Sequence, residues 1–141
     1  MGGFRAAYVG SMLAGILAGA SSLPAQAHHS FAMFDHAKTV TLKGTVESFS
    51  WGNPHVHITV DIPSGAADGT AAGTWDVEGA STNIMFRQGW NRISIKPGDK
   101  ITVVGFPTKD GSRGVALIYV ITPAGEKLWQ DVNRPGIAPQ S

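Results

Sequence analysis

The histidines are the residues of this 141-residue chain whose spacing best suits chemistry. His28 and His29 are adjacent, and His55 and His57 lie two residues apart. On a β-strand, side chains two residues apart share a face and lie about 6–7 Å from each other. Two imidazoles at that spacing can reach one metal ion. An isolated His-x-His pair is more often a surface pair without a ligand, so this pair needs support from elsewhere in the chain.

The N-terminal segment has the three parts of a secretory signal peptide. Arg5 supplies a positive charge, residues 6–20 are small and apolar, and Ala25-Gln26-Ala27 carries the small residues that signal peptidase requires. The apolar run is short for a membrane span, although a retained anchor is the alternative. The sequence therefore predicts cleavage after Ala27, a periplasmic location, and no membrane attachment of the mature chain.

Cleavage after Ala27 would make His28 the first residue of the mature protein. Its α-amine and its ring Nδ1 can then close a six-membered chelate on one cation. Nitrogen ligands in a tetragonal arrangement suit Cu(II), and a third nitrogen from a strand histidine would complete a T-shaped site. We predict a copper site that draws on His28, His29, His55 and His57. The alternative is that His28 merely follows a good cleavage site.

Alternation of apolar and polar residues predicts a mainly β fold. Strands are expected over residues 40–47, 55–62, 74–78, 101–106 and 115–121, and a short helix over 81–88. Ser81 is the expected N-cap of this helix, and Gly89 its C-terminal stop. This order, with Gly44 allowing a bend in the first strand, favours a five-stranded OB-type barrel with the helix between strands 3 and 4. A small β-sandwich is the alternative.

The chain therefore divides into four parts. Residues 1–27 are the signal peptide, 28–38 an N-terminal arm, 39–122 the β-barrel domain, and 123–141 a polar tail that we expect to be partly disordered. Phe31 and Phe34 are apolar and should anchor the arm to the barrel. An arm folded back beside the Asn53-Pro54 turn would bring His28 close to His55.

The turn between the first two strands contributes further candidate site residues. A hairpin centred on Gly52 would place Glu47 opposite His57, where its carboxylate could accept the imidazole N–H or approach the ion. Trp51 and Asn53 lie in this turn beside the histidines, and we predict that both contact a ligand.

Several segments together resemble a known family. They are His28-His29-Ser30-Phe31, Trp51-Gly52-Asn53-Pro54-His55, Val77-Glu78-Gly79, Gly89-Trp90, Lys96-Pro97-Gly98-Asp99 and Lys109-Asp110-Gly111. In these segments the chain resembles a family of uncharacterised exported bacterial proteins, classed as a domain of unknown function. The resemblance implies a periplasmic location and a single domain, but no activity. It also implies that His28, His29 and His55 belong to the family's motif, whereas position 57 varies.

Composition excludes several classes of function. The chain has no cysteine, so it has no thiolate metal site and no cysteine nucleophile. Without Arg5, ten basic residues balance ten acidic ones, and a neutral chain with no basic cluster is not expected to bind nucleic acid. The sequence shows no hydrolase triad, nucleophile elbow or phosphate loop. We expect a monomeric protein that is not an enzyme, with a periplasmic protein as a candidate partner.

Two functions remain. The favoured one is a periplasmic Cu(II)-binding protein that acts as a carrier, buffer or accessory factor through the mature N-terminal histidine. The alternative is a non-enzymatic periplasmic OB-type module that binds a protein or a small molecule, and in which the histidines are structural.

Overall fold

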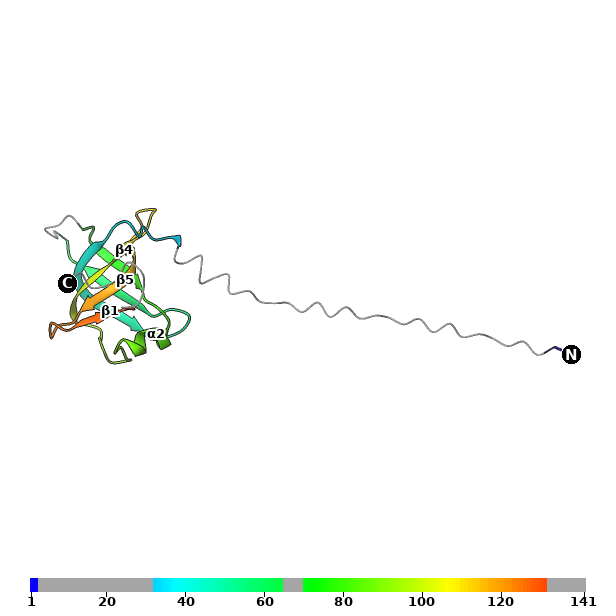
Figure 1. Cartoon of the computed structure of the whole chain (residues 1–141). Coiled ribbons are helices and arrows are strands. Elements are labelled where there is room, and N and C mark those ends of the chain that lie inside the picture. Colours follow the sequence, from blue (N-terminus) through cyan, green and yellow to red (C-terminus); the bar gives the residue numbers. More distant parts are fainter. Residues whose placement is uncertain (3–31, 65–69, 132–141) are drawn as a thin grey trace.

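The computed structural model describes residues 1–2, 32–64 and 70–131 of the chain. These residues contain six β-strands and one short α-helix (Figure 1). The elements are β1 (Val40–Ser50), β2 (His57–Ile62), β3 (Gly73–Glu78), α2 (Thr82–Arg87), β4 (Lys100–Pro107), β5 (Gly114–Ile121) and β6 (Lys127–Trp129).

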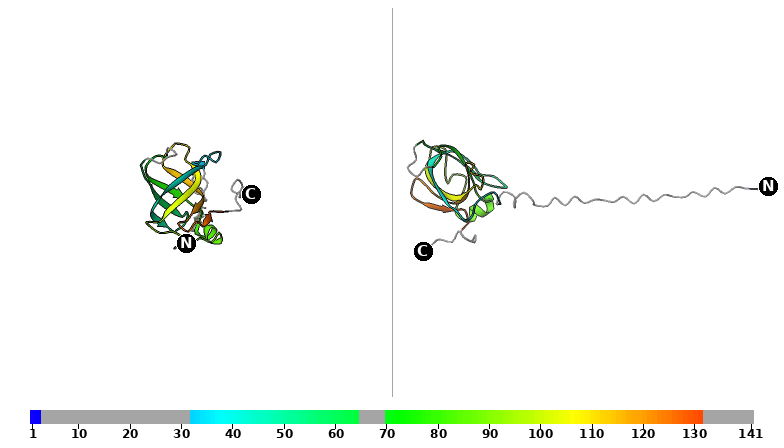
Figure 2. Two further views of the ribbon diagram at one scale, coloured as in Figure 1. Left: turned by 90° about the vertical axis from the view of Figure 1, so that its left-hand side faces the viewer. Right: turned by 90° about the horizontal axis from the view of Figure 1, so that it is seen from above.

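The first five strands close into a barrel. β1 pairs antiparallel with both β2 and β4, β2 with β3, and β4 with β5, while a parallel pairing of β3 with β5 completes the ring. The right-hand view of Figure 2 shows these strands as a closed ring. A single helix lies between the third and fourth strands. This arrangement confirms the predicted mainly β, OB-type barrel with one short helix.

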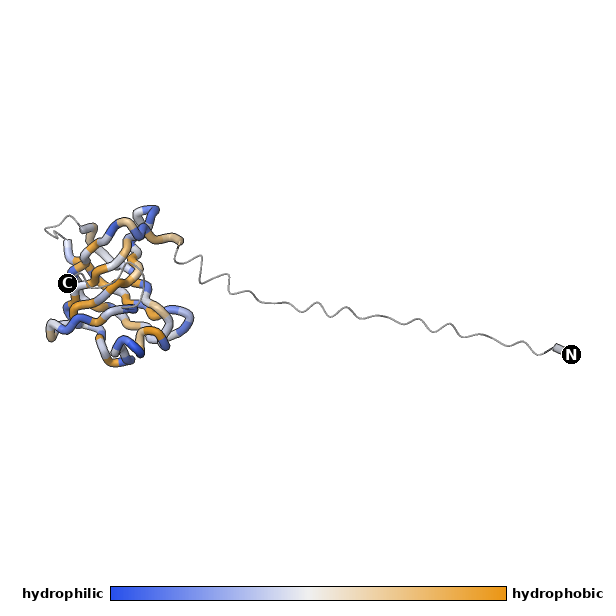
Figure 3. The backbone as a smooth tube through the Cα atoms, in the orientation of Figure 1, coloured by the Kyte–Doolittle hydropathy of each residue, from blue (hydrophilic) through white to orange (hydrophobic). Residues whose placement is uncertain are grey.

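Alternation along the strands builds the core as predicted. Val56, Ile58, Val60 and Ile62 are all at most 1% exposed, whereas the intervening residues of β2 face outward. Figure 3 shows hydrophobic residues recurring along the strands in this way. The outward face of β2 therefore presents polar side chains, and His57 is among them.

Close contact between β1 and β2 requires a glycine at position 44. A Cβ atom there would lie 2.3 Å from the carbonyl oxygen of Asp61, well inside van der Waals contact. The absence of a side chain allows β1 to pass close to β2 while it also pairs with β4, as the predicted bend requires.

The predicted register of the first hairpin was wrong. Ser50, not Glu47, lies opposite His57, because residues 51–56 form a six-residue connection rather than a tight turn about Gly52. Beyond Ser48, a bulge between Val46 and Ser48 changes the register by one residue. Glu47 lies at this bulge and therefore is not the cross-strand partner of His57.

Helix α2 forms where the sequence predicts it. Ser81 precedes the first helical residue in an extended conformation, and Gly89 follows with a φ of 92°. The Ser81 side chain makes no capping hydrogen bond; instead, the Asn53 side-chain oxygen accepts the backbone N–H of Thr82 at 3.1 Å. Met85, the buried residue of the helix, packs into the barrel core.

A sixth strand lies in the segment predicted as a polar tail. β6 pairs with the end of β5, and Leu128 and Gln130 are buried. Its three residues supply one buried apolar side chain, too few for an alternation pattern. Residues 132–141 of the predicted tail lie outside the described residues.

The arm is anchored on the outer face of β4 and β5. Phe34 is 5% exposed and packs in a second cluster with Phe106, Ala116 and Ile118. Its backbone forms an isolated β-bridge with Thr108, which is the first residue of the loop between β4 and β5. This confirms the anchoring role predicted for Phe34, whereas Phe31 lies outside the described residues. Within the described parts of the chain, no helix has the length and hydropathy needed to cross a membrane.

Candidate functional site

The outer face of β2 and β3 brings two histidines beside two carboxylates. His57 Nδ1 lies 3.1 and 3.2 Å from the two carboxylate oxygens of Asp76. His55 Nδ1 lies 3.3 Å from Glu78 Oε1 and 3.0 Å from the carbonyl oxygen of Gly79. We call these four side chains, His55, His57, Asp76 and Glu78, the histidine face.

The pairing of β2 with β3 explains these contacts. His57 lies opposite Glu78 and Thr59 lies opposite Asp76. The outward side chains therefore form two rows, and each imidazole reaches diagonally to a carboxylate of the neighbouring strand. The His57–Asp76 pair is open to solvent, with side chains 41% and 57% exposed, whereas those of His55 and Glu78 are 25% and 20% exposed.

These contacts determine which ring nitrogen is free. A carbonyl oxygen only accepts hydrogen bonds, so the Nδ1 of His55 carries the proton that it donates to Gly79. An ionised carboxylate also only accepts, so the Nδ1 of His57 donates to Asp76 in the same way. When such a ring carries this single proton, its Nε2 keeps the lone pair that a metal ion binds. Carboxylates and carbonyls orient metal-binding histidines in this manner.

The histidine face does not by itself form a complete metal site. Among residues 32–64 and 70–131, no three His, Asp or Glu side chains are placed to hold one ion. Further donors would have to come from elsewhere. His28 and His29, which the sequence predicts as ligands, lie outside the described residues.

Comparison with known families assigns the chain to one of them. The model of a family of unknown function, DUF6152, matches residues 16–116, which run through the end of β4 and into β5. The chain belongs to the DUF6152 family. No curated protein matches its sequence. Membership in DUF6152 brings no activity with it, so a function has to be argued from the site.

The anchored arm of this DUF6152 protein starts within reach of the histidine face. Phe34 pairs with Thr108, Thr108 bonds to Gly114, and Gly114 lies opposite Asp76. Three steps between neighbouring strands, at about 5 Å each, lead from Phe34 to Asp76, and a fourth leads to His57, which makes about 20 Å in all. His28 precedes Phe34 by six residues, which span about 20 Å when extended. The chain between them is therefore long enough to bring His28 to His57.

The other predicted site residues have structural contacts. Trp51 is half-buried and packs edge-on against Phe49, with ring centroids 5.9 Å apart. Asn53 Oδ1 accepts hydrogen bonds from both the backbone N–H and the hydroxyl of Thr82, so this side chain caps helix α2.

Asp76 and Glu78 are the residues of the histidine face that sequence reasoning missed. Asp76 and Glu78 lie two residues apart in the sequence, and their polar side chains point outward from β3. His55 and His57 have the same spacing. The alternation alone placed both pairs outward, but only the register of β2 against β3 shows that they meet. Pairing the second strand with the third, rather than only with the first, is the step that would have found them.

Proposed function

We propose that this protein is exported to the periplasm and that its mature form binds Cu(II), as a carrier, buffer or accessory factor. The ligands are the α-amine and ring of His28, together with the imidazoles of His55 and His57; His29 is a further donor beside them. The observation that carries the proposal is the orientation of two imidazoles, each held at Nδ1 by an acceptor.

The donor set favours copper over other divalent ions. An amine and several imidazoles are nitrogen donors, and a chain without cysteine offers no thiolate to favour other metals. With such donors, Cu(II) binds more tightly than Zn(II) in the general affinity series. The histidine face supplies two of the nitrogens, and a chelating first residue would supply two more, which makes a four-nitrogen site.

Asp76 and Glu78 act through the histidines in this proposal. A carboxylate that accepts the Nδ1–H fixes the ring and makes Nε2 a stronger donor. Loss of such a partner typically costs ten- to a hundred-fold in metal affinity. Glu47 does not have this role, because Ser50 is the residue of β1 that lies opposite His57.

The experiment is a Cu(II) titration of protein purified from the periplasm after expression with its own leader. Intact mass first checks that the chain begins at His28; a mass that retains residues 1–27 contradicts the export part of the proposal. We expect the His55→Ala/His57→Ala double variant to lose at least ten-fold in copper affinity. His36→Ala is the matched control, because His36 is exposed but packs against Phe106 outside the histidine face.

Two outcomes separate the possibilities. A loss in the double variant but not in the His36 variant supports the copper site. Equal affinities in all three proteins contradict it. Binding should also weaken in acid, because imidazoles must be unprotonated to bind a metal. Zn(II) titrated in parallel should bind more weakly than Cu(II).

One observation favours the alternative in which the histidines are structural. The hydrogen bond from His55 to Gly79 ties the β1–β2 connection to the end of β3. Two backbone hydrogen bonds, from Val56 to Ala80 and from Gly79 to Val56, close the same corner. If this is the whole role of His55, His55→Ala lowers the free energy of unfolding by about 1 kcal/mol and leaves copper binding unchanged.

A further inference from the structure

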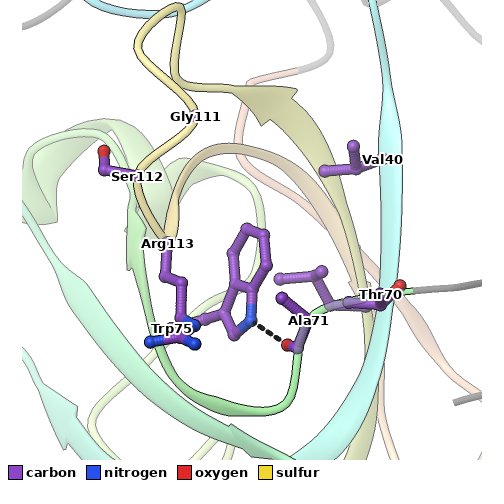
Figure 4. Close-up of a pocket in the computed structure, with 8 residues that line it drawn as sticks. Val40, Thr70, Ala71, Trp75, Gly111, Ser112 and Arg113 are labelled. Carbon is purple, nitrogen blue, oxygen red and sulfur yellow. Dashed lines mark hydrogen bonds between the residues drawn. The ribbon is translucent and has the colours of Figure 1, made fainter. Parts of the chain in front are cut away.

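A pocket of about 570 Å³ opens at the end of the barrel where β1 begins (Figure 4). Its apolar wall comes from Val40 and Leu42, and its polar wall from Ser112 and Arg113. Trp75 stands between these walls in the view of Figure 4. Cavities of this size hold small molecules of one or two rings.

The pocket is distinct from the histidine face. Trp75 points to the core side of β3, where it packs against the main hydrophobic cluster. Asp76 follows Trp75 in the strand and therefore points outward, toward His57. The sheet itself thus separates the pocket from the proposed copper ligands.

Trp75 is held in a fixed orientation at the pocket. Its indole N–H donates to the carbonyl oxygen of Ala71 at 2.9 Å, the dashed line in Figure 4. This bond satisfies the polar atom of the ring and leaves the ring as an apolar surface. A fixed indole of this kind offers a stacking surface for a planar ligand.

The loop that carries Arg113 is also held rigidly. Ser112 donates its backbone N–H to Asp110 Oδ1, and the Thr108 hydroxyl donates to the carbonyl oxygen of Ser112. The carbonyl oxygen of Arg113 in turn accepts the backbone N–H of Asp76. A rim ordered before binding loses little entropy when a ligand arrives.

Arg113 supplies an available positive charge. Its guanidinium lies against Gly73, at 3.7 Å from the position that a Cβ atom would occupy there. Within the described residues this guanidinium has no carboxylate partner, and its side chain is exposed. A guanidinium binds a carboxylate through two parallel hydrogen bonds.

We propose that this pocket binds a small aromatic carboxylate. The ring of the ligand packs against the indole of Trp75, and its carboxylate bonds to Arg113. The apolar wall disfavours a heavily hydroxylated ligand such as a sugar acid, because most of its hydroxyls would lose their hydrogen bonds to water without replacement.

The test compares two carboxylates with the neutral amides of the same shape. Benzoate, 2-naphthoate, benzamide and 2-naphthamide are each titrated into the protein by calorimetry. The NMR signal of the Trp75 indole N–H, assigned with Trp75→Phe, reports whether the ligand enters this pocket. We expect each carboxylate to bind at least ten-fold more tightly than its amide, and to shift the Trp75 signal.

Matched variants assign the preference to Arg113. Arg113→Gln should remove the difference between carboxylate and amide, whereas Lys109→Gln, which removes an exposed cation from the same loop, should keep it. Thermal unfolding checks that both variants are folded. Three results would overturn the proposal. The first is that no probe shifts the Trp75 signal even at a concentration of about 10 mM, which corresponds to a very weak affinity. The others are equal affinities for carboxylates and amides, and an equal preference for carboxylates in the Arg113 and Lys109 variants.

Discussion

Phe34 should determine whether the N-terminal arm stays on the barrel. Its side chain is 5% exposed and packs against Phe106, Ala116 and Ile118 outside the barrel core. The His36 ring also packs edge-on against Phe106, and two backbone hydrogen bonds join the arm to the β4–β5 region. They run from Asp35 to the Pro107 carbonyl at 2.8 Å and from Lys109 to the Met33 carbonyl at 2.9 Å.

The magnitude follows from the buried area of one phenylalanine. Burying a Phe side chain contributes about 1.5–3 kcal/mol, and each backbone hydrogen bond about 1 kcal/mol net. Phe34→Ala should therefore destabilise the docked arm by about 1.5–3 kcal/mol. Since the arm lies outside the main core, we expect this loss to appear chiefly as local opening rather than as global unfolding.

Native-state hydrogen exchange measures this opening directly. The amides of Asp35 and Lys109 donate the two hydrogen bonds, so both should exchange about 10- to 150-fold faster in Phe34→Ala. Met33→Ala is the matched control, because Met33 is 55% exposed and contributes its carbonyl rather than its side chain. If His28 binds copper, Phe34→Ala should also weaken copper binding.

Equal exchange rates at these two amides in the Phe34 and Met33 variants would refute the reasoning. Such a result would mean that the backbone bridge, and not the aromatic side chain, holds the arm. A uniform acceleration across the barrel strands would also contradict it, because the loss would then be global.

Three other predictions concern the barrel itself. Gly44→Ala should lower the free energy of unfolding, measured in urea, by about 2–3 kcal/mol, because the new methyl group would lie 2.3 Å from a backbone oxygen. Gly52→Ala is the control and should be nearly neutral, because no atom lies within 4 Å of a Cβ atom there. Equal effects of the two substitutions would exclude the close approach of β1 to β2. Asn53→Ala should cost about 1 kcal/mol by uncapping helix α2, and an unchanged unfolding midpoint would contradict this role. The backbone N–H of Ser112 lowers the pKa of Asp110 below its ordinary value of 3.8. The ionised carboxylate therefore stabilises the fold at neutral pH, and this contribution is lost as the pH falls below 3.8. Unfolding curves at pH 7 and pH 3 should show a smaller pH dependence of stability in Asp110→Asn than in the parent protein.

The barrel could be predicted because its core residues alternate in long runs. Val56 to Ile62 show an uninterrupted period of two, and each apolar member is buried in the structure. Helix α2 has recognisable residues at its ends, Ser81 before it and Gly89 after it, so the predicted bounds lie within one residue of the observed ones. β6 could not be found in this way, because it has one buried apolar residue and is defined by its pairing with β5.

The candidate site depends on long-range pairing, which a local pattern does not contain. The position of Glu47 was wrong because a bulge and a six-residue connection shift the hairpin register. The partners of the histidines, Asp76 and Glu78, lie about twenty residues further along and meet them only through the β2–β3 pairing. The histidines themselves could be chosen from residue type and spacing alone.

The most direct measurement of the copper proposal compares two forms of the mature chain. One begins at His28 with a free α-amine, and in the other the same amine is acetylated. The acetylated form keeps every imidazole, but its terminal nitrogen is a neutral amide, so the chelate with the ring of His28 cannot form. We predict that acetylation lowers the Cu(II) affinity at least ten-fold, or about 1.4 kcal/mol. Equal affinities in the two forms would contradict the account, because the N-terminal amine would then not be a ligand.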